Sequence, residues 1–536
     1  MLSGVFALTL ANLFVKTVGL ILKIPLRGIL SDSGMAYYNT AYDIYAFLYT
    51  VSNVGLPTAV SMLVSENRAS GNVKEIKKVL KIAISLFIII GIVGTSIMFF
   101  GAPLFEKAYK IDNSAYCIMA IAPTLFFIGI ASALKGYFQG YQNMVPSAIS
   151  NVIEAVGKMT LGILFAQYAA MKGEPAHIIA AYAALGLTIG VAAGMVFLII
   201  RKLLFRPQSY DIEYASLRSE NIEGRSGREI IKLLITIAIP ITLSSSVMTL
   251  SNMIDGMILS RVLQLNFSQE VTKAFIGNLK TCVVPISNII LAFANPITSV
   301  IVPMISASVA EGRADKVKKA MNSALRMAVM VILPCIFGIS VLAEPIVGFL
   351  FRDADAAAKA GPLLSVHAIS VFFMSMISVT AAILQAHKLG KLPVRSVVVG
   401  AVVKVVATTA LVAVPTVNVM GSPISAIVSC FAISAMNFYY IKKHIGYSPN
   451  FAKLLIKPLI AAGICAAGAA GSYNLFIMLA GASTSDIALL VSILVAAVIY
   501  VITALVIKAL TREEVEMLPK GKKIASALTK LKLLDK

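Results

Sequence analysis

Long apolar runs separated by short polar connections dominate this chain. A run of about 20 residues is long enough to cross the hydrocarbon core of a membrane as a helix. Fourteen such runs, called spans 1 to 14 here, lie at 3–30, 36–65, 79–104, 112–134, 145–171, 176–200, 233–260, 274–305, 322–345, 361–386, 396–414, 421–441, 454–477 and 486–507. The pattern predicts an all-α polytopic membrane protein with fourteen transmembrane helices.

Composition supports this interpretation and limits which classes of partner the protein could bind. Of the 536 residues 58% are hydrophobic and 13% charged, which is too apolar for a soluble globule. If the N-terminus is cytoplasmic, most of the 46 Lys and Arg residues fall in cytoplasmic loops and the C-terminal tail. That asymmetry is typical of a multi-pass protein of the bacterial cytoplasmic membrane with both termini cytoplasmic. The net charge of +21 therefore indicates topology and contact with membrane lipids, and argues against a nucleic-acid partner.

An internal repeat organises the spans. The loop SENRASGNVKEIKKVLK after span 2 recurs after span 8 as SASVAEGRADKVKKAMN, and Gly71 then matches Gly312. Further along, Gln139 and Lys158 match Gln385 and Lys404. We expect two parallel six-span repeats. The predicted domains are an N-lobe at 1–202 (spans 1–6), a cytoplasmic linker at 203–232, a C-lobe at 233–441 (spans 7–12), spans 13–14 at 442–510 and a basic tail at 511–536.

Span 1 carries three cations where a membrane helix usually has none. Lys16, Lys23 and Arg27 are spaced i, i+7 and i+11, which places them within an arc of roughly 40° on one helix face. We call this set the cationic face. A cation at the centre of a span costs at least about 2.5–3.5 kcal/mol, so this face should point into the bundle or a water-filled cavity. Pro25 predicts a kink between two of the cations.

Span 2 carries a row of tyrosines, Tyr38, Tyr42, Tyr45 and Tyr49, with Asp43 among them. Their i, i+4, i+7, i+11 spacing puts the four rings on one face. One interpretation is an aromatic belt at the membrane surface, which suits the first of them. The other is a polar-tipped cavity wall in which Asp43 serves as counter-ion to a cation of span 1.

Further charges lie inside later spans. Glu154 and Lys158 in span 5 are spaced i, i+4 and could form a structural ion pair. Lys404 occupies the equivalent place in span 11 without an acid one turn away. Asp255 in span 7 and Lys280 in span 8 complete the set. Buried charges of this kind are candidates for coupling or for lining a cavity.

The net charge of the ionic residues inside the spans is positive, which favours an anionic substrate. Six cations against three acids leave it about +3, and phosphate groups suit a mixture of Arg and Lys. The motifs GxxxxGK[ST], HExxH, CxxC and GxSxG do not occur, and the four His are scattered. The five Cys show no zinc or disulfide spacing. We therefore expect no catalytic residues, no metal and no cofactor, and not an enzyme.

Two segments carry a family resemblance: GMAYYNTAYDIYAFLYTVSNVGLPTAVSMLVSENRASGN and LKTCVVPISNIILAFANPITSVIVPMISASVAEG. They resemble the multidrug/oligosaccharidyl-lipid/polysaccharide exporter superfamily, within it the stage V sporulation protein B and MurJ-like branch of lipid II flippases. The resemblance implies two six-helix lobes around a central cavity, alternating access, and spans 13 and 14 lining a groove for a polyprenyl tail. It also implies a polyprenyl-diphosphate-linked glycan as substrate.

The resemblance suggests roles for individual residues. In such flippases, cavity arginines on spans 1, 2 and 8 are functionally required. Lys16, Lys23 and Arg27 match the cations of span 1, and Lys280 matches the basic residue five before a proline in span 8. Span 2 departs from the pattern, because Asp43 and the tyrosines stand where an Arg is expected.

Some relatives bind sodium through acids of spans 7 and 11. Asp255 could contribute to such a site, but span 11 carries Lys404 instead of an acid. This departure puts the sodium site, and with it the energy source, in question.

The leading hypothesis is a flippase for a lipid-linked cell-wall precursor, with lipid II as the first candidate. A transporter of another polyprenyl-diphosphate-linked polysaccharide unit would use the same cavity. A cation-coupled drug exporter fits less well, because cationic drugs call for an acidic cavity. A non-transporting scaffold that binds cell-wall synthesis proteins is the alternative from a different class, and buried charges argue against it.

Overall fold

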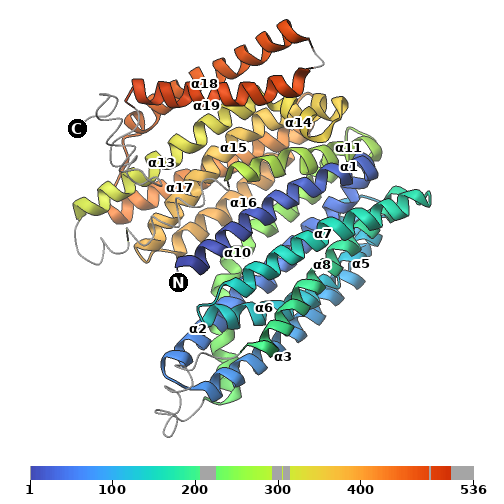
Figure 1. Cartoon of the computed structure of the whole chain (residues 1–536), viewed down its shortest axis with the longest axis vertical. Coiled ribbons are helices and arrows are strands. Elements are labelled where there is room, and N and C mark those ends of the chain that lie inside the picture. Colours follow the sequence, from blue (N-terminus) through green and yellow to red (C-terminus); the bar gives the residue numbers. More distant parts are fainter. Residues whose placement is uncertain (1, 206–224, 292–304, 306–313, 482–483, 509–536) are drawn as a thin grey trace. The chain divides into compact units, whose positions relative to one another are not determined.

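The computed structural model describes residues 2–205, 225–291, 305, 314–481 and 484–508, and these are almost entirely helical (Figure 1). No β-strand occurs within those ranges. The expected all-α polytopic membrane fold is confirmed.

The chain divides into two compact units, Met1–Gly277 and Asn278–Lys536. The first unit contains α1 (Leu2–Asn53), α2 (Gly55–Ala69), α3 (Val73–Phe100), α4 (Ala102–Tyr109), α5 (Ala115–Ile121), α6 (Thr124–Gly140), α7 (Val145–Met171), α8 (Ala176–Leu204), α10 (Gly227–Leu263) and nearly all of α11 (Gln269–Asn278). In the first unit, α10, which corresponds to span 7, packs on α1, α2 and α3. The predicted domain boundaries at 202 and 232 stay a prediction.

The second unit begins with a short π-helical turn, η1 (Leu279–Val283). Its longer elements are α13 (Ala314–Val341), α14 (Ala343–Phe351), α15 (Ala354–Ala386), α16 (Lys391–Val412), α17 (Gly421–Ile445), α18 (Phe451–Ala480) and α19 (Ser485–Val506), with a 3₁₀ turn η2 (Asn418–Met420). Helices α18 and α19, which correspond to spans 13 and 14, lie side by side (Figure 1). The predicted basic tail at 511–536 lies outside the described residues.

Twelve helices are long and apolar enough to cross a membrane, or thirteen if the bent α10 counts as one span, among the residues that the structure describes. The first candidate, Phe14–Ala69, has 56 residues. At 1.5 Å per residue that is about 84 Å, against about 30 Å of hydrocarbon. The segment is therefore long enough to cross twice, as spans 1 and 2. The total of fourteen remains a prediction.

The backbone of α1 leaves the helical conformation at Ser31, where φ is 60° and ψ is 178°. Pro25, where a kink was expected, stays inside the helix. A positive φ is unfavourable for a residue with a side chain. The break allows residues on its two sides to approach each other, which matters for the site described below.

Side chains cap the helices that begin on polar turns. Asn72 accepts a hydrogen bond from the Glu75 backbone amide at the start of α3. At the start of α10, Ser226 and Glu229 form a capping box in which each side chain binds the other's backbone amide. Such caps satisfy amides that have no partner inside the helix.

The two units repeat the same local geometry, which supports the internal duplication. Gln139 and Gln385, matched in the sequence, are each the last residue but one of their helices, α6 and α15. Three residues after each, Gln142 and Lys388 adopt φ values of 58° and 61°. Lys158 and Lys404 likewise lie on the first helices of two packed pairs, α7 with α8 and α16 with α17.

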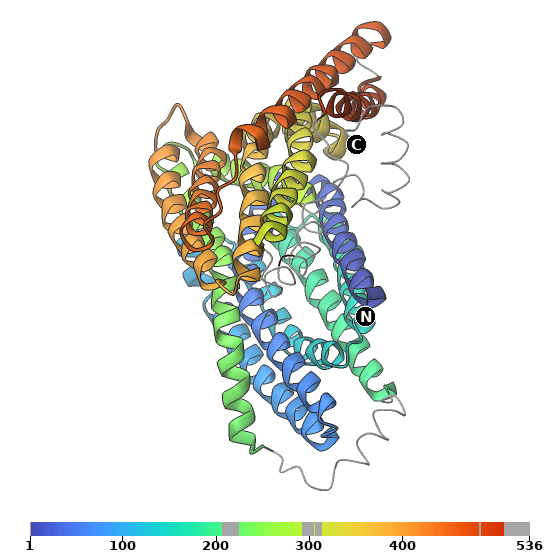
Figure 2. The ribbon, with the colours of Figure 1, turned by 90° about the vertical axis from the view of Figure 1, so that its left-hand side faces the viewer.

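A hydrophobic cluster fills the first unit between α2, α3, α6, α8 and α10. Figure 2 shows α10 in green running beside the blue helices α2 and α3. Ile230 and Leu234 of α10 are fully buried there against residues such as Val79. Because close packing of side chains holds membrane helices together, these contacts attach this half of α10 to the unit.

Helices α7 and α8 approach closely because glycines face each other. A methyl group added at Gly186 would lie 2.2 Å from the Gly162 amide nitrogen. One at Gly190 would lie 2.6 Å from the Lys158 amide nitrogen. Small residues of this kind allow backbones of membrane helices to pack.

We predict that Gly186→Ala destabilises the protein by about 1–3 kcal/mol, because the helices must separate to accommodate the methyl group. Thermal unfolding of the detergent-solubilised protein measures this. Gly463→Ala in α18 is the matched control, since no atom lies within 4 Å of the added methyl group. Equal unfolding temperatures for the two variants would show that the close approach does not matter.

Candidate functional site

The cationic face of α1 changes from exposed to buried along the helix. The Lys16 side chain is exposed, Lys23 is half-buried and Arg27 is only 6% exposed. Since an ammonium group in a membrane-crossing helix cannot point into hydrocarbon, the exposed Lys16 indicates a face in contact with water.

Partners for two of the cations come from the part of α1 beyond the Ser31 break. Nε and Nη2 of Arg27 donate to Oδ1 of Asp32 at 2.8 Å and 2.5 Å. Nζ of Lys23 donates to Oδ1 of Asn39 at 3.1 Å. The break therefore brings the start of span 2 against the cationic face. Asp32 lies between two predicted spans, and the sequence offered no sign of its role as the partner of Arg27.

The tyrosines of span 2 form a continuous row. Ring centroids are 6.3 Å apart for Tyr38 and Tyr42, 5.5 Å for Tyr42 and Tyr45, and 5.6 Å for Tyr45 and Tyr49. Tyr38 and Tyr45 are buried inside the unit. That burial argues against an aromatic belt facing the membrane surface.

Lys158 lies on this row. Its Nζ is 4.6 Å from the centroid of the Tyr42 ring, a cation–π contact that stabilises an ammonium away from water. The ion pair recorded for Glu154 is with Lys135 of α6, whose Nζ lies 3.8 Å from Oε2. The Glu154 carboxylate thus pairs with Lys135 and also interacts electrostatically with Lys158 one turn away, so the structural ion pair suggested by their spacing stays a prediction.

A second polar group lies where α4 meets α10. The Tyr109 hydroxyl is 3.1 Å from the Met253 carbonyl oxygen and 3.5 Å from Oδ2 of Asp43. Asp255, two residues after Met253, is buried. Burial, reinforced by the Asp43 carboxylate, raises the pKa of Tyr109 well above its usual value, so its hydroxyl remains a proton donor.

Lys273 is a buried cation that the sequence analysis missed. Its Nζ donates to the Tyr37 hydroxyl at 2.8 Å and to Oε1 of Glu270 at 2.9 Å. Ser33 donates to the other oxygen of Glu270 at 3.1 Å. Lys135 was missed for the same reason: the predicted apolar runs at 112–134 and 274–305 stop one residue short of each lysine. Inspecting the residues that flank each apolar run would have found both.

The remaining two candidates belong to the second unit. Lys280 is half-buried in the π-helical turn η1, a conformation that is frequent at functional sites. Lys404 is half-buried on α16. Among the described residues no group of three or more His, Cys, Asp or Glu side chains could hold a metal ion.

Comparison with known proteins assigns the chain to a family. A family model described as polysaccharide biosynthesis protein matches residues 1–309, which is more than half of the chain. The chain belongs to the polysaccharide biosynthesis protein family. A second model, MatE, matches residues 240–410.

Two proteins of Bacillus subtilis (strain 168) are similar over most of their length. Lipid II flippase MurJ is 26% identical over 477 residues, covering 85% of each chain. Stage V sporulation protein B is 23% identical over 533 residues, covering 97% of each. A solved structure of lipid II flippase MurJ in an inward closed conformation covers 93% of this chain and 97% of its own at 13% identity, with a TM-score of 0.67.

These findings confirm the resemblance to the exporter superfamily and its MurJ and stage V sporulation protein B branch. MurJ is named as a lipid II flippase, and this family member is a multi-pass membrane protein and not an enzyme.

We predict that Glu154→Ala lowers the free energy of unfolding by about 1–3 kcal/mol, because Lys135 loses its carboxylate partner in a buried position. Adding Lys135→Met should recover part of the loss, since the double variant no longer leaves the Lys135 ammonium without its carboxylate, while Lys158 still lacks Glu154. Thermal unfolding in detergent measures both variants. Glu174→Ala, at an exposed carboxylate, is the control. A double variant no more stable than the single one would contradict the pairing.

Proposed function

We propose that this family member is a flippase that moves a lipid-linked, diphosphate-bearing cell-wall precursor, with lipid II as the first candidate. The observation that carries the proposal is the cationic face of α1, with Lys16 exposed and Arg27 buried on one membrane-crossing helix. The similarity to lipid II flippase MurJ over 85% of the chain supports the substrate class.

Counter-ion exchange at Arg27 is the central step. Without substrate, Asp32 neutralises the buried guanidinium, since a buried charge without a partner costs about 3–5 kcal/mol. A diphosphate carries more charge than a carboxylate and suits the planar fork of the guanidinium. It therefore displaces Asp32 and binds Arg27, after first meeting the exposed Lys16.

The other candidates support this site. Lys280, on the π-helical turn η1, is proposed as a further cation that binds the diphosphate. Asp43 is proposed to compete with the diphosphate for these cations. Glu154, Lys158, Asp255 and Lys404 are proposed coupling or cavity charges. With both termini cytoplasmic, the cationic face extends about 16 Å along the helix from Lys16 to Arg27, toward the outer leaflet. An inside-negative potential favours outward movement of an anion by about 2.3 kcal/mol per charge per 100 mV.

Transport of another polyprenyl-diphosphate-linked polysaccharide unit is the second candidate. It is favoured by the match of residues 1–309 to the polysaccharide biosynthesis family. The diphosphate contacts would be the same, and the glycan would distinguish the two substrates.

We predict opposite effects for the two members of the Arg27 pair. Arg27→Ala weakens lipid II binding by roughly tenfold or more, because a charge-assisted contact is lost. Asp32→Asn strengthens binding by up to about tenfold, because the competing carboxylate is gone. Titration of purified protein with lipid II measures both, and labelled lipid II in proteoliposomes at an imposed potential measures flipping.

Lys172→Ala serves as the control, since this exposed cation lies just beyond the end of α7. Weaker binding in both pair variants would rule out counter-ion exchange. Unchanged binding and flipping in Arg27→Ala would rule out the site.

A further inference from the structure

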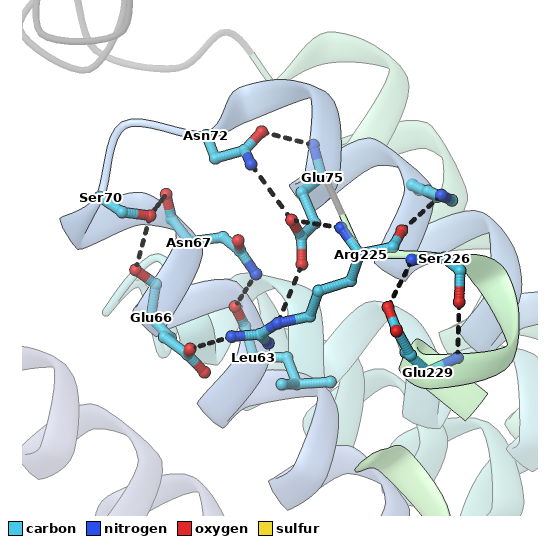
Figure 3. Close-up of polar contacts among 10 residues, drawn as sticks. Leu63, Glu66, Asn67, Ser70, Asn72, Glu75, Arg225, Ser226 and Glu229 are labelled. Carbon is cyan, nitrogen blue, oxygen red and sulfur yellow. Dashed lines mark hydrogen bonds and ion pairs between the residues drawn. The ribbon is translucent and has the colours of Figure 1, made fainter. Parts of the chain in front are cut away.

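Arg225, the last residue before the capping box of α10, lies between two carboxylates of the first unit (Figure 3). Its Nη2 pairs with Glu66 near the end of α2, and its Nε lies 3.6 Å from Oε1 of Glu75 in the first turn of α3. We call these three residues the Arg225 clamp. Through it, the start of α10 meets the consecutive helices α2 and α3, which lie about 150 residues earlier in the chain.

The backbone of Arg225 is also held. Its amide donates to Oε2 of Glu75 at 3.3 Å, and its carbonyl accepts from Nζ of Lys78 at 2.6 Å. Figure 3 shows Asn72 bound to the same Glu75 carboxylate, at 3.1 Å. Four interactions thus hold Arg225 itself, more than a solvated surface ion pair requires, and Asn72 in turn holds Glu75.

Glu75 makes the clamp more than a surface contact. Its side chain is only 4% exposed. The N-terminus of α3 favours a carboxylate there, and Arg225 supplies the positive charge that its buried oxygen faces. Hydrogen bonding to Glu66 raises the pKa of Arg225, which keeps the guanidinium charged.

The internal repeat supplies an independent observation. At the offset of 241 that aligns Gly71 with Gly312, Glu66 corresponds to Ala307 and Glu75 to Lys316. At these two aligned positions the second copy thus has no acid, although Asp315 lies in the first turn of α13 one position before the match to Glu75. The exact pair of acids that contacts Arg225 belongs to the copy against which the start of α10 is packed.

The clamp continues into the hydrophobic cluster of the first unit. One and two turns beyond it, Ile230 and Leu234 are fully buried. A methyl group at Gly227 would lie 3.6 Å from Cδ1 of Ile82 in α3. Polar and apolar contacts thus fasten the same stretch of α10 to the same two helices.

We propose that Arg225 is a positioning residue that keeps the first half of α10, Gly227–Leu243, attached to α2 and α3 throughout transport. The role in transport rests on the proposed flippase function. The attachment itself does not. In this arrangement Arg225, in the last part of the predicted linker, is held against α2 and α3. Span 7 therefore begins as part of the first unit.

Hydrogen exchange tests the attachment without any transport assay. Arg225→Gln should speed exchange of the amides of residues 72–78 and 227–234 by roughly tenfold or more. Arg225→Lys should lie between this variant and the parent protein, because it keeps the charge and loses the fork. Arg228→Gln is the matched control, an exposed Arg three residues on. Equal exchange in Arg225→Gln and Arg228→Gln would overturn the proposal.

Cross-linking tests whether the attachment must persist. Ile82→Cys with Gly227→Cys, in a background without the five native cysteines, allows a short thiol-specific cross-linker to join α3 to α10. The cross-linked protein should keep its flipping rate, and the cross-link should restore flipping in Arg225→Gln. Loss of flipping on cross-linking, reversed by cleaving the linker, would show that the attachment opens. If the parent protein does not flip the lipid, the proposed function fails, while the exchange result still decides the attachment.

Discussion

A charge inside a membrane needs a partner or water, and this constraint explains the arrangement of the first unit. Hydrocarbon offers neither, so each ionic side chain of a membrane-crossing helix must meet another part of the protein or a wet surface. Arg27 meets Asp32, Lys135 meets Glu154, and Lys158 meets the face of Tyr42. The helix break at Ser31, the tyrosine row and the position of α6 all serve these contacts.

The same constraint links structure to transport. A partner that neutralises a buried cation can be exchanged for an anion of higher charge, whereas an apolar core offers nothing to exchange. The contact between Arg27 and Asp32 on α1 satisfies this condition. Lys158 differs, because it lies against the Tyr42 ring and also interacts electrostatically with the Glu154 carboxylate one turn away. In the proposed mechanism the contact of Arg27 with Asp32 changes during the cycle and the surroundings of Lys158 do not.

Local patterns predicted much of this protein. Apolar runs indicated the helices, and the spacing of Lys16, Lys23 and Arg27 indicated their common face, because both depend only on helix periodicity. The internal repeat was also visible, and matched left-handed residues at Gln142 and Lys388 support it.

Partners that come from other helices were not predictable in this way. Asp32 lies in a predicted connection, and Lys135 and Lys273 fall one residue outside apolar runs, since a hydropathy criterion ends a run at a charge. The Arg225 clamp joins residues about 150 positions apart, a separation that helix periodicity cannot reveal.

Competition binding by native mass spectrometry tests the central claim that the cationic face is a diphosphate site. Purified protein would be offered lipid II, a different polyprenyl-diphosphate glycan and a lipophilic cation together, alongside a Lys16/Lys23/Arg27 triple alanine variant. The account predicts that lipid II binds in preference to the others and that the triple variant loses it. Preference for the cation, or full binding by the triple variant, would contradict it.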